Sequence, residues 1–153
     1  MCVLMISAQS VEDPLDLERQ VCFALAVAAR DVIALYRPLL EPMGLTHPQY
    51  LVMLALWGGT PLSVKELSRK LALDPATLSP LLKRLEASGY VTRSRAASDE
   101  RQLAVALTDE GRALRERALA IPPAIVERLG MSLEELQGLH AVLTRVIAAA
   151  GRS

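Results

Sequence analysis

The 153-residue sequence predicts a mainly α-helical fold with one small β-hairpin. Apolar residues recur at steps of three and four along most of the chain, which is the helical period. Ser, Thr or Asp stands immediately before several of these segments, as expected of helix N-caps. Residues 90–95 and 102–107 instead alternate apolar and polar side chains in the manner of strands. The composition, 52% hydrophobic and 22% charged, supports a packed core and excludes a disordered, collagenous or disulfide-framework protein.

The first two helices are predicted over residues 14–41 and 48–57. The first carries an apolar stripe and has no interior Gly or Pro before Pro38. The second begins with Pro48 at the first helical position, where a missing N–H costs nothing, and it ends at two glycines. His47 precedes this proline and is therefore expected in an extended conformation.

Two short helices follow. Ser63 caps a helix over residues 64–71, and Glu66 completes a capping box. Asp74 caps a second helix, which begins at Pro75 and ends at Gly89. The connection between the two helices is tight, and this predicts a helix-turn-helix.

The C-terminal part begins with the two strands, which the polar residues 96–101 join into a hairpin. Thr108 then caps a long helix, in which Pro122-Pro123 is expected to produce a kink. Ser132 caps a final helix that ends near residue 150.

This order of elements predicts a winged helix-turn-helix over residues 48–107. Residues 1–13 are expected to form a flexible N-terminus, and residues 14–47 with 108–150 a helical dimerisation region that flanks the winged domain. The terminal helices are too apolar to stand alone, so a homodimer is predicted, with completion of a monomer core as the alternative. The side chains that require cover are Ile121, Ala124, Ile125, Leu129, Leu136, Leu139, Leu143 and Ile147.

The charge distribution is uneven although Lys plus Arg equals Asp plus Glu at 17 each. Residues 63–101 contain eight basic and five acidic side chains, a balance of +3. This local excess indicates that a polyanion is met there, while a solvated helix face is the alternative. In a helix-turn-helix the second helix enters the major groove of double-stranded DNA, and a dimer reads a pseudo-palindromic operator.

The candidate DNA-binding residues lie on that second helix and on the hairpin. Hydroxyls at the helix start can meet base edges or phosphates, and cations further along suit phosphates. An arginine at a wing tip fits the minor groove, where an acidic neighbour two residues away could hold its guanidinium. The residues concerned are Thr77, Ser79, Lys83, Arg84, Arg93, Arg95, Asp99 and Arg101.

Two groups of residues resemble a known family. The first comprises Leu67-x-x-x-Leu71, Asp74-x-x-Thr77-Leu78-Ser79-x-x-Leu82-Lys83-Arg84-Leu85-Glu86-x-x-Gly89-Tyr90-Val91-x-Arg93, Asp99-Glu100-Arg101 and Leu107-Thr108-x-x-Gly111. The second comprises Gln20-Val21-Cys22-Phe23-Ala24-Leu25, Tyr36-Arg37-Pro38-Leu39-Leu40 and Thr46-His47-Pro48-Gln49-Tyr50-Leu51. The first group resembles the MarR family of dimeric bacterial repressors. The second resembles its organic hydroperoxide resistance branch, the OhrR type, and together they cover residues 15–150.

The resemblance implies a redox site at Cys22. In that branch an N-terminal cysteine is oxidised by peroxide, and tyrosines of the partner subunit bind its sulfur through hydrogen bonds. Tyr36 stands at one of these tyrosine positions, whereas Ala26 and His47 replace two others. We expect His47 to substitute as a cationic or hydrogen-bonding group, or else only to cap the next helix. Cys2 is a poor resolving cysteine, so a low-molecular-weight thiol is expected to resolve the oxidised site.

The predicted function is therefore that of a repressor that releases its operator when an organic hydroperoxide oxidises Cys22. A MarR-type repressor released by a small aromatic or phenolic ligand is the alternative. A thiol peroxidase is disfavoured because nucleotide loops and paired catalytic carboxylates are missing from the sequence, and we expect no enzyme activity and no cofactor. Two cysteines cannot form a zinc site. Neither a secretory signal nor a membrane span is recognisable, which predicts a cytoplasmic protein.

Overall fold

The computed structural model describes residues 13–96 and 99–151, with the backbone alone given for residues 96 and 99–102. The predicted flexible segment 1–13 lies outside the described residues except for Asp13. The chain divides into two compact units, Met1–Ala34 and Leu35–Ser153. The described residues confirm a mainly helical fold with a small antiparallel sheet.

The N-terminal unit contains a short 3-10 helix, η1 (Leu17–Arg19), and the first turns of α1 (Val21–Leu40). The prediction of one helix from residue 14 was wrong, because Gln20 is extended with ψ 125° and separates η1 from α1. The Gln20 side-chain amide donates to the carbonyls of Pro14 and Asp16 at 2.9 and 3.0 Å, which stabilises the break. As a result, Cys22 lies in the first turn of α1.

The second unit continues from α1 through a 3-10 turn, η2 (Glu41–Met43), into α2 (His47–Gly58). His47 is the first residue of α2 and is not the extended residue that was predicted. Thr46 takes the extended conformation instead, and its N–H donates to Oε1 of Gln49 at 2.9 Å. Proline is accepted in the first helical turn, so Pro48 at the second position does not prevent His47 from being helical.

The helix-turn-helix consists of α3 (Val64–Leu71) and α4 (Pro75–Ala87). Both predicted caps are confirmed: the Ser63 hydroxyl accepts from the Glu66 N–H at 3.0 Å, and the Asp74 carboxylate accepts from the Thr77 N–H at 2.8 Å. Gly89, predicted to end the second helix, follows α4 with φ +84°, in the left-handed region that favours glycine.

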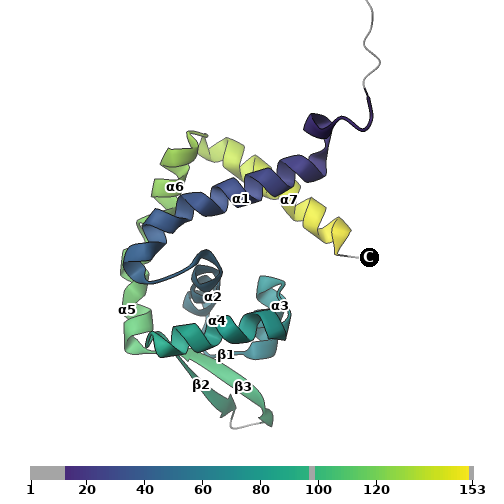
Figure 1. Cartoon of the computed structure of the whole chain (residues 1–153). Coiled ribbons are helices and arrows are strands. Elements are labelled where there is room, and N and C mark those ends of the chain that lie inside the picture. Colours follow the sequence, from purple (N-terminus) through teal and green to yellow (C-terminus); the bar gives the residue numbers. More distant parts are fainter. Residues whose placement is uncertain (1–12, 97–98, 152–153) are drawn as a thin grey trace, which may run out of the picture. The chain divides into compact units, whose positions relative to one another are not determined.

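The sheet has three strands in the order β1-β3-β2, formed by β1 (Leu62–Ser63), β2 (Val91–Ala96) and β3 (Asp99–Leu107). The predicted hairpin of β2 and β3 is confirmed and projects away from α4 as the wing (Figure 1). The strand β1, which was not predicted from the sequence, pairs antiparallel with β3 through Leu62 and Val105. Two residues are too few to show strand periodicity.

The C-terminal helices are α5 (Asp109–Ala118), α6 (Ile121–Leu129) and α7 (Leu133–Ala150). Pro122-Pro123 was expected to kink one long helix, but the helix ends at Ala118 and the prolines lie in the first turn of α6. Prolines lack the N–H that would continue α5, whereas a first turn does not need it. The caps Thr108 and Ser132 are confirmed.

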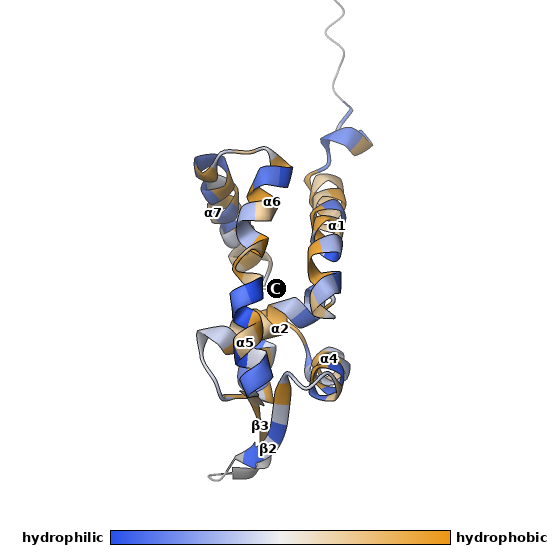
Figure 2. Ribbon diagram, turned by 90° about the vertical axis from the view of Figure 1, so that its left-hand side faces the viewer, coloured by the Kyte–Doolittle hydropathy of each residue, from blue (hydrophilic) through white to orange (hydrophobic). Residues whose placement is uncertain are grey.

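The core of the second unit lies between α2, α3, α4, the sheet, α5 and the start of α6. Figure 2 shows hydrophobic and hydrophilic residues on the same helices, as expected of amphipathic elements. The buried leucines of α4 are Leu78, Leu81, Leu82 and Leu85. Two of the apolar residues predicted to need a partner, Ile121 and Ile125, are instead buried in this core.

Candidate nucleic-acid interface and cysteine site

The start of α4 presents a polar, solvent-exposed surface. Because the four leucines of this helix face the core, its opposite side is free, and Thr77 is exposed there while Ser79 is half-buried. The hydrogen bond from the Thr77 N–H holds the pKa of the Asp74 carboxyl below its ordinary value, so this cap stays ionised. The first turn is therefore fixed by hydrogen bonds from both the backbone and the side chain of Thr77 to the Asp74 carboxylate, and the exposed Thr77 side chain lies at the solvent-facing start of the helix.

Exposed cations surround this helix. Lys83 and Arg84, which the sequence analysis selected, are exposed one to two turns beyond Thr77. The preceding helix α3 adds three further exposed cations that the sequence analysis did not select: Lys65, Arg69 and Lys70. Five positive side chains on a helix-turn-helix form a surface suited to the phosphate backbone of a nucleic acid.

The wing contains the remaining candidates. Arg93 does not stand free, because its Nε and Nη2 donate to the two carboxylate oxygens of Glu86 at 3.3 and 3.2 Å. Arg95 is exposed two residues further along β2. The backbone of Asp99 and Arg101 belongs to β3, but their side chains lie outside the described part of the structure, so the predicted pairing between them stays a prediction.

Four aromatic side chains of the second unit form a cluster, which we call the aromatic cluster: Tyr36, His47, Tyr50 and Trp57. The rings of Tyr36 and His47 have centroids 5.0 Å apart and an interplanar angle of 65°. Tyr50 lies 5.8 Å from Tyr36 and 6.5 Å from Trp57, again between ring centroids. Tyr36 near the end of α1 therefore contacts His47 in the first turn of α2. Both residues were assigned to the redox site from the sequence.

Burial fixes the protonation states in the aromatic cluster. Desolvation raises the pKa of Tyr36 above 10.0, and desolvation together with the nearby Tyr36 raises that of Tyr50. Both phenols therefore remain hydrogen-bond donors near neutral pH. Desolvation lowers the pKa of His47 below 6.5, so its imidazole is neutral at pH 7. The expected role of His47 at the redox site, cationic or hydrogen-bonding, stays a prediction, and a neutral imidazole can still form hydrogen bonds.

Cys22 is a free, exposed cysteine in the first turn of α1. A thiolate is the reactive form of cysteine, and exposure leaves the Cys22 sulfur accessible to an oxidant. This position is a consequence of the late start of α1. Cys22 belongs to the N-terminal unit, whereas Tyr36 and His47 belong to the second unit.

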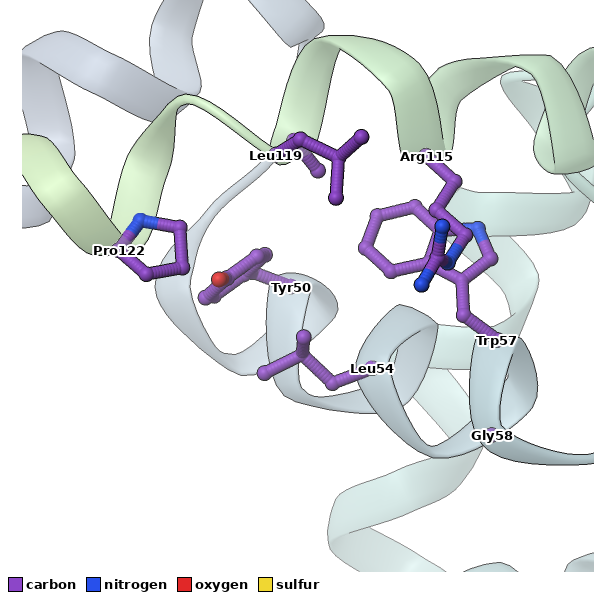
Figure 3. Close-up of a pocket in the computed structure, with 8 residues that line it drawn as sticks. Tyr50, Leu54, Trp57, Gly58, Arg115, Leu119 and Pro122 are labelled. Atoms are coloured by element: carbon purple, nitrogen blue, oxygen red, sulfur yellow. The ribbon is translucent and has the colours of Figure 1, made fainter.

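A pocket of about 270 Å³ adjoins the aromatic cluster. Figure 3 shows Tyr50, Leu54 and Trp57 of α2 opposite Arg115, Leu119 and Pro122. The walls are apolar and aromatic, and Arg115 supplies one positive charge. Such a lining suits a small molecule with a flat apolar body and an anionic group.

Besides the three cations of α3, the residues Glu86, Tyr50 and Trp57 were not assigned to a site from the sequence. Tyr50 follows His47 by three residues, so helical spacing places both on one face of α2 and could have revealed the pair. Glu86 and Arg93 are separated by the end of α4 and the turn into β2, and no local periodicity predicts that contact.

Known proteins are similar to this chain over most of its length. Residues 34–117 match the family described as transcriptional regulator SarA/Rot. The HTH-type transcriptional regulator TtmR of Methylorubrum extorquens is 48% identical over 128 residues, which is 84% of this chain and 66% of TtmR. The organic hydroperoxide resistance transcriptional regulator of Bacillus subtilis is 41% identical over 131 residues, which is 86% of this chain and 89% of that regulator.

A solved structure has the same fold. Reduced AbfR bound to DNA is 36% identical, superimposes with a TM-score of 0.73, and covers 88% of this chain and 94% of AbfR. AbfR has also been solved bound to DNA in an overoxidised form, with a TM-score of 0.72. In the part of this chain that the structure describes, no group of three or more His, Cys, Asp or Glu could hold a metal ion. The described helices likewise include none with the length and hydropathy needed to cross a membrane.

Proposed function

Because the chain belongs to the SarA/Rot family of MarR-like winged helix-turn-helix transcriptional regulators, we propose that it is a dimeric repressor that senses organic hydroperoxides through Cys22. It binds DNA as a transcriptional regulator and is not an enzyme. The observation that carries the sensing proposal is the 41% identity with the organic hydroperoxide resistance regulator of B. subtilis. Acting on bacterial chromosomal DNA would place the protein in the cytoplasm.

The proposed DNA contacts lie on α4 and on the wing of the winged domain, residues 48–107. Thr77 and Ser79 read base edges or phosphates, Lys83 and Arg84 bind phosphates, and Arg95 and Arg101 serve the wing, with Asp99 holding Arg101. Residues 14–47 and 108–150 form the dimerisation region. Every residue of α7 is described and none of its side chains is buried, which supports the assignment of its apolar residues to a second copy.

The proposed chemistry begins with the Cys22 thiolate. Its sulfur attacks the distal oxygen of a hydroperoxide ROOH, the O–O bond breaks, and the alkoxide takes a proton to leave as the alcohol ROH. Cys22 becomes a sulfenic acid. A low-molecular-weight thiol then attacks the sulfenic sulfur, which releases water and leaves a mixed disulfide. Because overoxidised AbfR has been solved on DNA, we assign operator release to the mixed disulfide, whose bulk re-packs the dimer helices, and not to a higher sulfur acid.

The site we propose requires both copies of the chain. In the organic hydroperoxide resistance branch that this sequence resembles, tyrosines of the partner subunit bind the sulfur of the reactive cysteine through hydrogen bonds. We therefore assign Tyr36 and His47 of one protomer to the Cys22 thiolate of the other, with the Tyr36 phenol and the neutral imidazole as hydrogen-bond donors.

The experiment measures operator affinity with and without cumene hydroperoxide and glutathione. The operator is first selected from random duplexes by the native protein. We expect oxidant plus thiol to lower the affinity of the native protein and of the control Cys2→Ser, and to leave Cys22→Ser unchanged. Release of Cys22→Ser by the oxidant would contradict the sensing proposal while leaving DNA binding intact.

A second candidate function is favoured by the pocket beside the aromatic cluster. Its apolar walls and Arg115 fit an aromatic carboxylate or phenolate that acts as the effector of a repressor. Salicylate is a suitable probe. If salicylate releases the operator from Cys22→Ser but not from Arg115→Gln, the small-molecule mechanism holds; if salicylate leaves operator binding of the native protein unchanged, this candidate is excluded.

A further inference from the structure

Glu86 and Arg93 connect α4, the second or recognition helix of the helix-turn-helix, to the wing. The guanidinium donates from Nε to Oε2 at 3.3 Å and from Nη2 to Oε1 at 3.2 Å, so both carboxylate oxygens are engaged by one planar group. The contact with Arg93 holds the pKa of Glu86 below its ordinary value. Two parallel bonds from a planar fork restrict orientation as well as distance, which a single-point contact does not.

The position of Arg93 on the sheet explains why it reaches Glu86. Side chains alternate along a strand, so Arg93 shares a face of β2 with the buried Val91. Its partner across the ladder is Val105, which is fully buried. The Arg93 side chain is only 21% exposed, because its stem lies on the core face of the sheet while its head meets the last turn of α4.

We infer that the Glu86–Arg93 pair is a positioning device that fixes the wing relative to the recognition helix. The inference rests on the DNA-binding function of the winged domain. The recognition helix and the wing contact different grooves, and so they bind well only when their spacing is set in advance. Between α4 and β2 the chain passes through a turn at Gly89. Glu86 stands before this turn and Arg93 after it, so their ion pair is a side-chain link across the turn.

Arg93 therefore acts through Glu86 and is a positioning residue, which replaces its sequence-based assignment to DNA. Arg95 lies on the same face of β2, and its exposed side chain forms no hydrogen bond or ion pair with the described residues. The Arg95 guanidinium is thus available for a phosphate. It also provides a matched control, because Arg95→Gln and Arg93→Gln remove the same charge from the same strand.

The experiment is a double-mutant cycle on operator affinity, measured with the full chain over a range of salt concentrations. The variants are Glu86→Gln, Arg93→Gln, the double variant, the exchange Glu86→Arg with Arg93→Glu, and the control Arg95→Gln. We expect each single variant of the pair to bind roughly two- to fivefold more weakly, as for loss of one partly exposed ion pair. The double variant should be no weaker than either single variant, and the exchange should recover most of the affinity.

The salt dependence separates positioning from direct contact. The slope of log K against log salt counts phosphate contacts, so it should be unchanged in Arg93→Gln and smaller in Arg95→Gln. If Arg93→Gln lowers the slope as Arg95→Gln does, while Glu86→Gln binds as tightly as the native protein, Arg93 is a phosphate ligand and the inference is overturned. Additive effects of the two single variants would also overturn it. Thermal unfolding of each variant shows whether it is folded under the conditions of the binding measurement. Failure of the native protein to bind any duplex would refute the proposed function and not this inference.

Discussion

The imidazole of His47 meets the ring of Tyr36 edge to face, with 5.0 Å between the ring centroids. This contact joins the end of α1 to the first turn of α2, and Tyr50 extends it with a centroid 5.8 Å from that of Tyr36. The same burial that holds these rings together keeps His47 neutral and both phenols protonated near neutral pH. The aromatic cluster therefore presents hydrogen-bond donors without a positive charge.

The neutral state of His47 predicts a specific pH dependence of stability. Its pKa is below 6.5 in the folded protein and near 6.5 when unfolded, so the unfolded state takes up the proton first. The full contribution to stability is present above pH 6.5 and is lost as the pH falls through the pKa of the folded state. We expect urea unfolding between about pH 8 and about pH 5 to show a shallower decline in His47→Phe than in the native protein. The exposed His140, changed to Gln, is the control, and equal declines in native protein and His47→Phe would contradict a neutral, half-buried His47.

The close packing around Gly111 predicts that Gly111→Ala and Gly138→Ala have very different effects on the free energy of unfolding. A Cβ on Gly111 would lie 2.1 Å from the carbonyl oxygen of Tyr90, so the backbone must move. We expect Gly111→Ala to lower the free energy of unfolding by about 1–3 kcal/mol. Gly138 also lies in a helix, but its Cβ would meet no atom within 4 Å, and Gly138→Ala should be neutral or stabilising by up to about 1 kcal/mol. Chemical denaturation measures the free energy of unfolding of the two variants. Equal values for Gly111→Ala and Gly138→Ala would show that the contact of Gly111 with Tyr90 is not tight.

The exposed side chain of Thr77 predicts a change in DNA affinity. Thr77→Val keeps the side-chain shape and the N–H that binds Asp74, and it removes the hydroxyl, which also bonds to the Asp74 carboxylate. We expect binding to weaken by about 1 kcal/mol, roughly fivefold, at each half-site, measured at a temperature at which both proteins are fully folded. The control is Thr92→Val on β2, which is exposed and was not assigned to DNA. Operator affinity of Thr77→Val equal to that of the native protein would remove Thr77 from the interface.

The unburied face of α7 predicts an effect on assembly. Leu139, Val142 and Val146 recur at helical spacing and are 47%, 53% and 39% exposed in the single chain. Leu139→Glu would bury an unpaired charge in a dimer, and we expect it to weaken dimerisation roughly tenfold or more. Gln137→Glu introduces the same charge about 200° around the helix and should leave the dimer intact. Sedimentation over a concentration series tests this, and a native protein that remains monomeric at all concentrations would refute the dimer.

Local sequence signals predicted most of the elements. Asp74, Ser63, Thr108 and Ser132 each cap the helix that was assigned to them, because an N-cap depends only on the few residues beside it. The errors fall where two local signals compete. From periodicity alone, the first helix was predicted to begin at residue 14. In the structure the Gln20 side-chain amide donates to the carbonyls of Pro14 and Asp16, and α1 begins only at Val21.

The site could be predicted only in part. Exposed side chains such as Lys83 and Arg84 follow from the opposite face of a helix whose buried leucines are recognisable in the sequence. The pairing of Arg93 with Glu86 depends on how β2 packs against α4, which no spacing along the chain encodes. The same is true of the contact between Trp57 Nε1 and the carbonyl of Gly111, which joins α2 to α5 at 2.9 Å across 54 residues.

Oxidation of Cys22 and release of the operator can be measured on the same sample. The native complex with fluorescent operator is titrated with cumene hydroperoxide in the presence of glutathione. Each aliquot is divided between anisotropy, which gives the fraction of operator bound, and mass spectrometry of the Cys22 peptide, which gives the fraction present as mixed disulfide. Our account predicts that the released fraction rises in proportion to the mixed disulfide and that reduction restores binding. Release while Cys22 remains an unmodified thiol, or full binding when Cys22 is entirely in the mixed disulfide, would contradict it.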